Sequence, residues 1–221
     1  MEQIETGKRT HCIRCGECCL SSTPSLQKED ISLLRERRIS NDSLYTIRAG
    51  ELVWDNVFGE FKTVDNEIIK VRERAEGGCF YYEKRSSSCT IYEYRPIQCA
   101  AMACWDESEF LRVYDEPKAE RQDIVHESML LHLIEEHEER CSYLKLHKYA
   151  RNIKEKGEEA VREILELLKF DYHFRPFISN RLGININQME LLFGRPLVKT
   201  VEMFGLKVIR QPDGSFLLTM L

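Results

Sequence analysis

The feature that most constrains this chain is the segment His11–Cys19, in which four cysteines fall within eight residues and form the pattern CxxCGxCC. The chain opens with the polar residues MEQIETGKRT, which contain no apolar run of the kind that a signal peptide needs. We therefore expect a cytoplasmic protein, whose thiols stay reduced. Under those conditions, clustered cysteines indicate metal binding or dithiol redox chemistry rather than disulfides.

Four further cysteines lie well downstream, so the chain must fold back on itself if all the thiols share a site. Together the two sets supply eight candidate metal ligands: Cys12, Cys15, Cys18, Cys19, Cys79, Cys89, Cys99 and Cys104. A ninth cysteine, Cys141, stands apart from both sets. An odd number of cysteines also argues against a complete disulfide framework.

The spacing within the first set suits metal binding. Cys12, Cys15 and Cys18 are separated by two residues each and can hold one metal from a tight turn, where Gly16 lets the backbone bend. Cys19 follows Cys18 directly, and neighbouring side chains diverge. The pair therefore indicates two adjacent sites, or one site with an additional thiol, and two four-ligand sites would use all eight cysteines.

Three interpretations of the cysteines stay open. An iron–sulfur cluster, 4Fe–4S in the first place, is favoured because the three-cysteine spacing and the small residues after Cys99 suit a bulky group. Zinc that holds a small domain together is the second interpretation, since sets made only of thiolates suit both metals. A dithiol redox role is the third.

Three segments carry a resemblance to a known family. They are CxxCGxCC, then Gly78-Cys79-Phe80, then Cys89–Cys99 with the pattern C-x-I-Y-x-x-R-P-x-x-C. Over about residues 11 to 105 the chain resembles the YkgJ-type CxxCxxCC family, described as zinc- or iron-chelating. The resemblance implies metal binding through the eight cysteines, and it leaves residues 106–221 outside.

The composition narrows the classes of partner. The chain is 43% hydrophobic and 31% charged, as in a soluble globular protein, and its net charge of −5 disfavours nucleic acid and anionic lipid. It contains no glycine-rich phosphate loop, GxSxG elbow, HExxH or dinucleotide fingerprint. We expect an unidentified protein partner, no nucleic acid and no membrane.

The predicted fold class is α+β, with a small irregular cysteine-rich metal-binding domain over residues 1–116 and a mainly helical region over 117–221 that ends in a β-hairpin. The two are expected to pack as one unit. In the first domain, caps and turn residues predict helices from Pro24, from Asn41 or Asp42 to Gly50, from Pro96 and over 107–114. Short strands are predicted within 52–71 and over 79–82.

In the second region, the lack of glycine and proline predicts a long helix over 118–156, with one break near 140–143. A helix over 158–168, an aromatic segment over 170–177, two short helices that end at Gly194 and Gly205, and a hairpin over 206–221 follow. The residues predicted to share one buried stripe of the long helix are Leu130, Ile134, His137, Cys141 and Leu144.

Three residues outside the eight have two interpretations each. His137 and Cys141 stand four apart on a helix and can reach one metal, but they also fall on the buried stripe, and the core interpretation is favoured. Arg95 can hydrogen-bond a sulfur of the metal centre, or it pairs with a carboxylate such as Glu93, and the pairing with a carboxylate is favoured.

The leading functional hypothesis is a metal-cluster protein, with iron–sulfur favoured over zinc, that is an accessory in electron transfer or metalloprotein maturation. One alternative is a protein-modifying enzyme that resembles flagellin lysine methylases, although no catalytic motif supports it. The other is a protein-interaction module held together by zinc.

Overall fold

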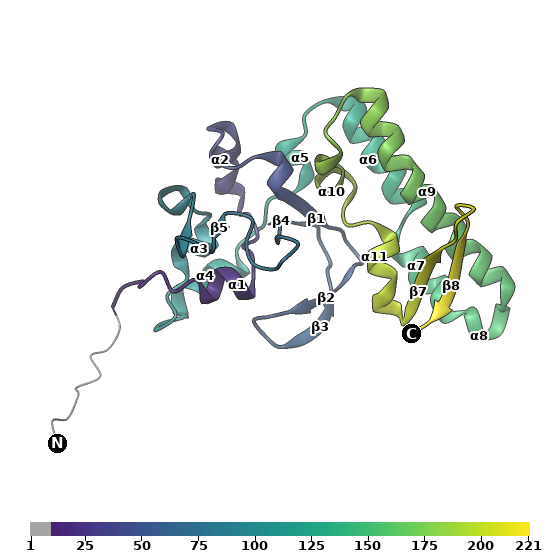
Figure 1. Ribbon diagram of the computed structural model, residues 1–221, viewed down its shortest axis with the longest axis horizontal. Helices are drawn as coiled ribbons and strands as arrows, with labels where there is room; N and C mark the ends of the chain where they lie inside the picture. The colour runs from purple at the N-terminus through teal and green to yellow at the C-terminus, as the bar shows by residue number, and fades with distance from the viewer. Residues whose placement is uncertain (1–9) are drawn as a thin grey trace, which may run out of the picture. The chain divides into compact units, whose positions relative to one another are not determined.

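The computed structural model describes residues 10–221, which divide into two compact units. One unit contains the described chain up to Ser40 together with Val71–Ala119, and the other contains Asn41–Lys70 and Glu120–Leu221. Residues 41–70, which the sequence assigns to the first domain, therefore pack with the C-terminal half. Helices and short antiparallel strands are mixed, and a hairpin ends the chain, so the predicted α+β class is confirmed (Figure 1).

The first unit consists of short elements. They are α1 (Glu17–Ser21), η1 (Lys28–Asp30), α2 (Ile31–Arg35), the two-stranded sheet β5 (Tyr82–Glu83) and β6 (Ser88–Cys89), η3 (Tyr92–Tyr94), α3 (Ile97–Ala101) and α4 (Ser108–Asp115). Helix η1 starts later than the predicted helix at Pro24, and β5 starts later than the predicted strand at Cys79. The predicted helices from Pro96 and over 107–114 are confirmed as α3 and α4.

A buried carboxylate anchors the helix that carries Cys99. Asp30, which is 3% exposed, accepts a hydrogen bond from the backbone N–H of Gln27 at 2.9 Å and another from the N–H of Ile97 at 3.0 Å. The first bond caps η1 and the second caps the start of α3. One side chain thus fixes the entry of α3 and, two residues later, the position of Cys99.

The second unit has longer helices. Its elements are η2 (Asn41–Ser43), β1 (Leu44–Ile47), β2 (Leu52–Asp55), β3 (Glu60–Thr63), β4 (Ile68–Val71, whose last residue counts with the first unit), α5 (Arg121–Ile124), α6 (Ser128–Arg140), α7 (Tyr143–Arg151), α8 (Ile153–Lys156), α9 (Glu158–Leu182), η4 (Ile186–Gln188), α10 (Met189–Phe193), α11 (Leu197–Thr200), η5 (Val201–Phe204), β7 (Leu206–Arg210) and β8 (Phe216–Met220). The strands pair as β1–β4, β2–β3 and β7–β8.

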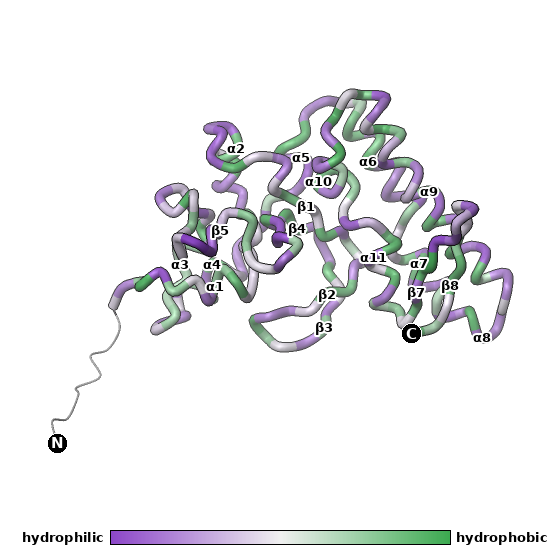
Figure 2. Tube along the Cα trace, in the orientation of Figure 1, coloured by the Kyte–Doolittle hydropathy of each residue, from purple (hydrophilic) through white to green (hydrophobic). Residues whose placement is uncertain are grey.

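Two apolar clusters form most of the core of this unit, and both include residues of α9. The first contains Cys141, Tyr143, Leu146, Ile164, Leu167, Leu168, Leu197, Val201 and Leu206. The second contains Val125, Ile134, Ile178, Met189, Leu192 and Phe193. Figure 2 shows hydrophilic and hydrophobic residues alternating along α9, as expected for a helix that buries one side.

The helix predicted from Asn41 to Gly50 is wrong. Asn41–Ser43 form a single turn of 3-10 helix, and Leu44–Ile47 then form strand β1, in which all four residues are buried. The segment Leu-Tyr-Thr-Ile consists largely of β-branched and aromatic residues, which suit a buried strand. The turn residue at position 41 fits a helix start and a strand start equally well.

The long helix predicted over 118–156 is also wrong in part, because the segment forms four helices. The predicted break is confirmed: α6 ends at Arg140, and the Ser142 side chain caps α7 by accepting from the N–H of Leu144 at 3.2 Å. Because α6 ends and α7 starts as a separate helix, the helical periodicity is interrupted, and Leu144 no longer lies on the same face as the buried residues of α6. Leu144 is 75% exposed, whereas Ile134 and His137 are buried as predicted.

Helix α9 is longer than the predicted helix over 158–168. It runs for 25 residues and passes through Pro176, so the aromatic segment over 170–177 is helical. Phe170 and Phe174 stack at 5.1 Å between ring centroids, whereas Phe177 is 63% exposed. No helix among residues 10–221 is both long enough and apolar enough to cross a membrane.

Candidate metal centre

All eight candidate ligands belong to the first unit, and no disulfide joins the described cysteines. Their exposure decreases toward the middle of the set. Cys12, Cys15, Cys18 and Cys104 are exposed, Cys19, Cys89 and Cys99 are half-buried, and Cys79 is buried.

A close contact between Gly16 and Tyr82 positions the first motif. Gly16 has φ of 81° and precedes α1, the short helix that carries Cys18 and Cys19. A Cβ at Gly16 would lie 2.0 Å from the Tyr82 Oη, so no other residue fits there without displacing the tyrosine. Glycine at this position therefore lets the motif lie directly against β5.

The downstream cysteines fold back onto this motif. The backbone N–H of Cys79 donates a hydrogen bond to the carbonyl of Cys19 at 2.7 Å. Cys89 lies opposite Tyr82 in the β5–β6 pair, and Cys99 lies on α3. Two chain segments far apart in the sequence thus meet through the backbone itself.

Five of the eight thiols lie close enough to influence one another's ionisation, and we call Cys18, Cys19, Cys79, Cys89 and Cys99 the five-thiol group. Charges on Cys18, Cys99 and Cys79 raise the pKa of Cys19, and charges on Cys79, Cys18 and Cys89 raise that of Cys99. The exposed Cys12, Cys15 and Cys104 are not among the charges that act most strongly on these thiols. The structure therefore brings five of the predicted ligands together from four segments of the chain.

The side chains of Cys18 and Cys19 form a hydrogen bond with each other. Their sulfurs lie 4.0 Å apart, and the hydrogen bond from Cys19 lowers the pKa of Cys18 to about 6, although burial opposes the shift. The same hydrogen bond, together with burial, raises the pKa of Cys19. One thiolate thus forms readily at neutral pH, and thiolate is the form that binds metals.

The other thiols of the group are held neutral by their surroundings. Burial raises the pKa of Cys79, Cys89 and Cys99, and the Arg95 guanidinium opposes this at Cys89 and Cys99. A bound cation would favour the deprotonated forms, so binding of metal would release protons.

Arg95 does not pair with Glu93 in the described part of the chain. Its guanidinium lies over the Tyr92 ring at 4.0 Å, and Arg14, at φ of 56°, covers the same ring at 4.2 Å. The stack links the first cysteine motif to the segment before Cys99. It holds positive charge beside the five-thiol group, and the predicted hydrogen bond from Arg95 to a sulfur stays a prediction.

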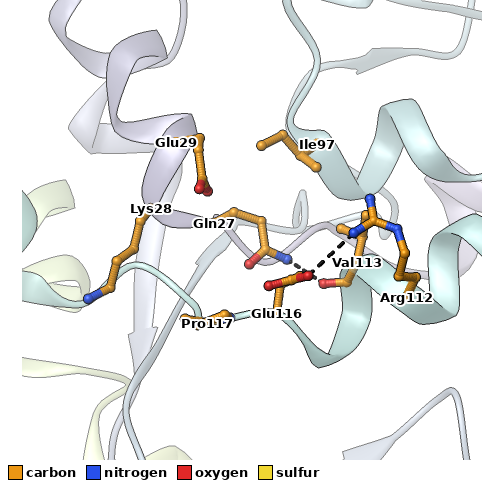
Figure 3. Close-up of a pocket in the computed structure, with 8 residues that line it drawn as sticks. All are labelled: Gln27, Lys28, Glu29, Ile97, Arg112, Val113, Glu116 and Pro117. Carbon is orange, nitrogen blue, oxygen red and sulfur yellow. Dashed lines mark hydrogen bonds and ion pairs between the residues drawn. The ribbon is translucent and has the colours of Figure 1, made fainter.

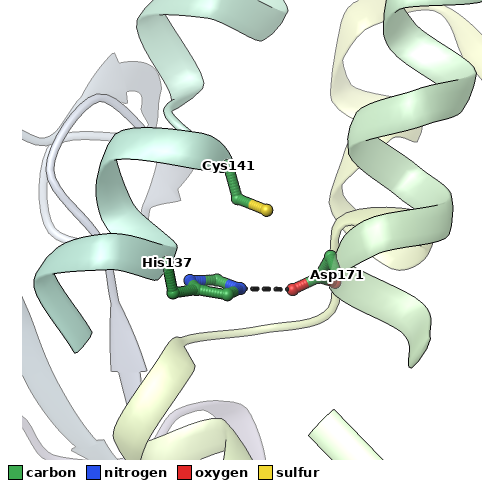
Figure 4. A group of neighbouring side chains, drawn as sticks. All are labelled: His137, Cys141 and Asp171. Atoms are coloured by element: carbon green, nitrogen blue, oxygen red, sulfur yellow. Dashed lines mark hydrogen bonds and ion pairs between the residues drawn. The ribbon is translucent and has the colours of Figure 1, made fainter. Parts of the chain in front are cut away.

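A second group of potential ligands lies in the other unit. His137, Cys141 and Asp171 are completely buried, and one ligand atom from each lies within 4.8 Å of the others (Figure 4). His137 Nε2 and Asp171 Oδ1 are 2.8 Å apart. Asp171 is the member that sequence reasoning missed, although its spacing of four from Arg175 was a detectable sign of an ion pair.

The contacts of Asp171 favour a structural role for this group. Its Oδ1 accepts from Arg175 Nε at 2.9 Å and Nη2 at 2.7 Å, and its Oδ2 accepts from the N–H of Leu197 at 2.8 Å. Burial lowers the pKa of His137, and the charges of Arg48 and Arg175 lower it further. Both carboxylate oxygens of Asp171 already accept hydrogen bonds, which favours the core interpretation of His137 and Cys141.

A pocket in the first unit is separate from the cysteines. It has a volume of about 400 Å³ and is lined by Gln27, Lys28, Glu29, Ile97, Arg112, Val113, Glu116 and Pro117 (Figure 3). The Gln27 amide is held by a bond to the carbonyl of Val113 at 2.8 Å, and Arg112 pairs with Glu116 at 3.3 Å. The lining contains neither cysteine nor histidine, so it adds no ligand to the metal centre.

Comparison with known proteins agrees with this geometry. Residues 11–116 match the model of the CxxCxxCC family, whose description is "Putative zinc- or iron-chelating domain". The chain is 28% identical over 91 residues to "Uncharacterized protein MJ0661" of Methanocaldococcus jannaschii, a match that covers 40% of this chain and 41% of that protein. The chain thus spans about two fifths of the length of this relative.

No solved structure matches the chain. The family match contains all eight candidate ligands and ends at residue 116, before the helices of the second unit. The model of the CxxCxxCC family, described as a "Putative zinc- or iron-chelating domain", thus covers residues 11–116, just under half of this chain.

Proposed function

We propose that the cysteines of the first unit hold an iron–sulfur cluster, 4Fe–4S in the first place, and that the protein is an accessory in electron transfer or metalloprotein maturation. The observation that supports this proposal is the five-thiol group, which gathers sulfur ligands from four chain segments within a metal-chelating family domain. The eight proposed ligands are Cys12, Cys15, Cys18, Cys19, Cys79, Cys89, Cys99 and Cys104.

The gathering of five thiols from four chain segments favours a cluster over a single zinc ion. Zinc–sulfur bonds of about 2.3 Å in a tetrahedron place each pair of sulfurs about 3.8 Å apart. Cys18 and Cys19, at 4.0 Å, approach this value, whereas the other three thiols of the five-thiol group come from three further segments of the chain. A group of several iron atoms accepts thiolates that stand further apart than one ion does.

The residues of this chain have distinct parts in the proposal. When bound, a cluster supplies an electron that it can accept and release. Cys18 offers the most readily formed thiolate, and Cys79 and Cys99 are sheltered from water. Arg95 places positive charge beside the sulfurs, which stabilises thiolates and raises the tendency of a cluster to accept an electron.

The cellular setting is part of the same proposal. Nine cysteines without a described disulfide suit a reducing compartment such as the cytoplasm. A net charge of −5 suits a protein partner better than nucleic acid or an anionic membrane. An accessory role requires such a partner, because a bound cluster must exchange electrons or iron with another protein.

Anaerobic purification followed by visible absorption and metal analysis tests the proposal. The expected result is a brown protein with iron and acid-labile sulfide in equal amounts and an absorption band that bleaches with dithionite. A colourless protein with stoichiometric zinc would contradict the cluster and support the alternative function, a protein-interaction module held together by zinc. A folded protein that contains neither metal would contradict both.

A further inference from the structure

The C-terminal hairpin has one edge strand, β8, that carries no charged residue or proline to prevent pairing with another strand. Strands β7 and β8 pair in a register that places Val208 opposite Leu218. The flanking bonds, from the N–H of Gln211 to the carbonyl of Ser215 at 2.8 Å and from the N–H of Leu221 to the carbonyl of Gly205 at 2.9 Å, fix which peptide groups face inward. In an antiparallel pair these groups alternate, so odd-numbered residues of β8 bond to β7 and even-numbered residues face outward.

The outward-facing peptide groups of β8 belong to Phe216, Leu218 and Met220. None of their N–H or carbonyl groups has a hydrogen-bond partner in residues 10–221. The strand Phe216–Met220 carries no charge, whereas β7 carries Lys207 and Arg210. Natural edge strands are commonly protected by charges or proline, and β8 has neither (Figure 1, yellow).

We propose that β8 pairs with β8 of a second copy of this chain, antiparallel and about a two-fold axis at Leu218. In this register Leu218 faces Leu218 of the second copy, and Phe216 faces Met220 of the second copy. Every outward N–H and carbonyl group of each β8 then has a partner, and the two hairpins form one four-stranded sheet.

A second copy suits this edge because the register is self-complementary. The pairing brings no like charges together, since neither β8 carries a charge. The other edge, β7, carries Lys207 and Arg210, so pairing through β7 would place cationic side chains of both copies in one interface, at a cost in free energy. On the solvent side of the sheet, Leu217, which is 48% exposed, would lie beside Thr219 of the second copy and lose part of its contact with water.

Sedimentation equilibrium of the full chain tests the proposal, with two substitutions at Leu218. The wild-type chain is expected to dimerise. Leu218→Pro removes an outward N–H that the hairpin itself does not use, so it should raise the dissociation constant at least about tenfold. Leu218→Ala loses the same contact with the core of its own unit but keeps the N–H, so it should still dimerise.

Charged substitutions at two positions of β8 give a second test, which does not depend on the effect of a proline in the strand. Leu217 and Thr219 of the two copies lie opposite each other in the proposed register, so Leu217→Glu with Thr219→Glu should abolish the dimer, while the hairpin itself is kept because Thr219 lies opposite Lys207. Leu217→Lys with Thr219→Glu should keep it, because opposite charges then face each other. A wild-type chain that stays monomeric, or equal dissociation constants for the two double variants, would overturn the proposal.

Discussion

A single glycine controls how closely the first cysteine motif approaches β5. At Gly16 a Cβ would meet the Tyr82 ring, whereas at Gly77, with φ of 85°, a Cβ would meet nothing within 4 Å. The two glycines share the left-handed backbone, so the comparison separates the cost of the backbone from that of the contact.

We predict that Gly16→Ala lowers the free energy of unfolding by at least about 1 kcal/mol more than Gly77→Ala. Both substitutions cost roughly 1–2 kcal/mol of stability because a Cβ is unfavourable in left-handed backbone. Gly16→Ala has the further cost of the steric overlap between this Cβ and the Tyr82 ring. Urea unfolding of both variants measures the difference. In a Tyr82→Ala background the difference should disappear, and its persistence would contradict the contact.

His137 gives the protein a dependence on pH. Burial and the charges of Arg48 and Arg175 lower its pKa in the folded state, although Asp171 opposes them. Because the folded pKa lies below the unfolded value of about 6.5, this residue contributes stability above that pH. The contribution is lost as pH falls from there through the folded pKa.

We expect the free energy of unfolding to fall with pH below about 6.5, with a slope from His137 of at most about 1.4 kcal/mol per pH unit. His137→Gln should flatten the curve in this window. The matched control is His132→Gln, at a side chain that is 69% exposed, which should leave the slope unchanged. Equal slopes for the two variants would show that His137 does not titrate as described.

At the scale of elements, Asp171 and Arg175 join α9 to the segment that contains α10 and the start of α11. Arg175 donates to the carbonyls of Met189 and Gly194, at 3.1 and 2.7 Å, while Asp171 accepts from Leu197. A buried pair of this kind is held by many bonds at once, so removal of one partner leaves a buried charge without compensation.

We predict that Asp171→Asn lowers the free energy of unfolding by about 3–5 kcal/mol, because the Arg175 charge stays buried without its carboxylate. The exposed pair of Arg112 and Glu109 is the control, since both side chains are about 60% exposed. Glu109→Gln should change stability little. Denaturant unfolding at neutral pH measures both, and comparable effects would contradict the account.

Local signals such as proline and glycine predict a helix or a strand well only where contacts with the rest of the fold do not choose between the two. Pro96, Pro196 and Gly194 mark the ends of short helices in the sequence as in the structure. Leu44–Ile47 form a strand because they are buried beside β4, and no local signal shows that contact. The turns that divide residues 118–156 contain no glycine or proline, so helical spacing alone places Leu144 wrongly.

At the scale of the molecule, the two units differ in what can stabilise them. The first unit consists of short elements around the cysteines, whereas the second has its own apolar clusters and buried ion pairs. Small domains that bind structural or cluster metals depend on them for folding.

We therefore predict that removal of metal unfolds the first unit and leaves the second folded. Hydrogen exchange measured by mass spectrometry after chelation should show faster exchange at Cys79, whose N–H bonds to Cys19, and at α3. Exchange in α9 should stay slow. Uniform loss of protection in both units, or none in either, would contradict this division.

The sequence predicts which cysteines form the candidate metal centre, but not the contacts that surround them. The pattern of the eight cysteines predicts that distant segments meet, and the bond between Cys79 and Cys19 shows how they do so. The sequence holds no sign of the hydrogen bond between Cys18 and Cys19, or of the stack of Arg14 and Arg95 on Tyr92, since each depends on a turn geometry set by the fold. Asp171 beside His137 likewise arises from helix packing.

The most direct test of the central claim, that thiols of the first unit hold the metal, is the metal content of two cysteine variants purified anaerobically. Cys99→Ser removes a member of the five-thiol group, and Cys141→Ala removes a buried thiol of the second unit whose pKa burial raises to about 12. We predict that Cys99→Ser loses most of the bound metal per chain and that Cys141→Ala retains the wild-type amount. Full metal content in Cys99→Ser, or an equal loss in Cys141→Ala, would contradict the claim.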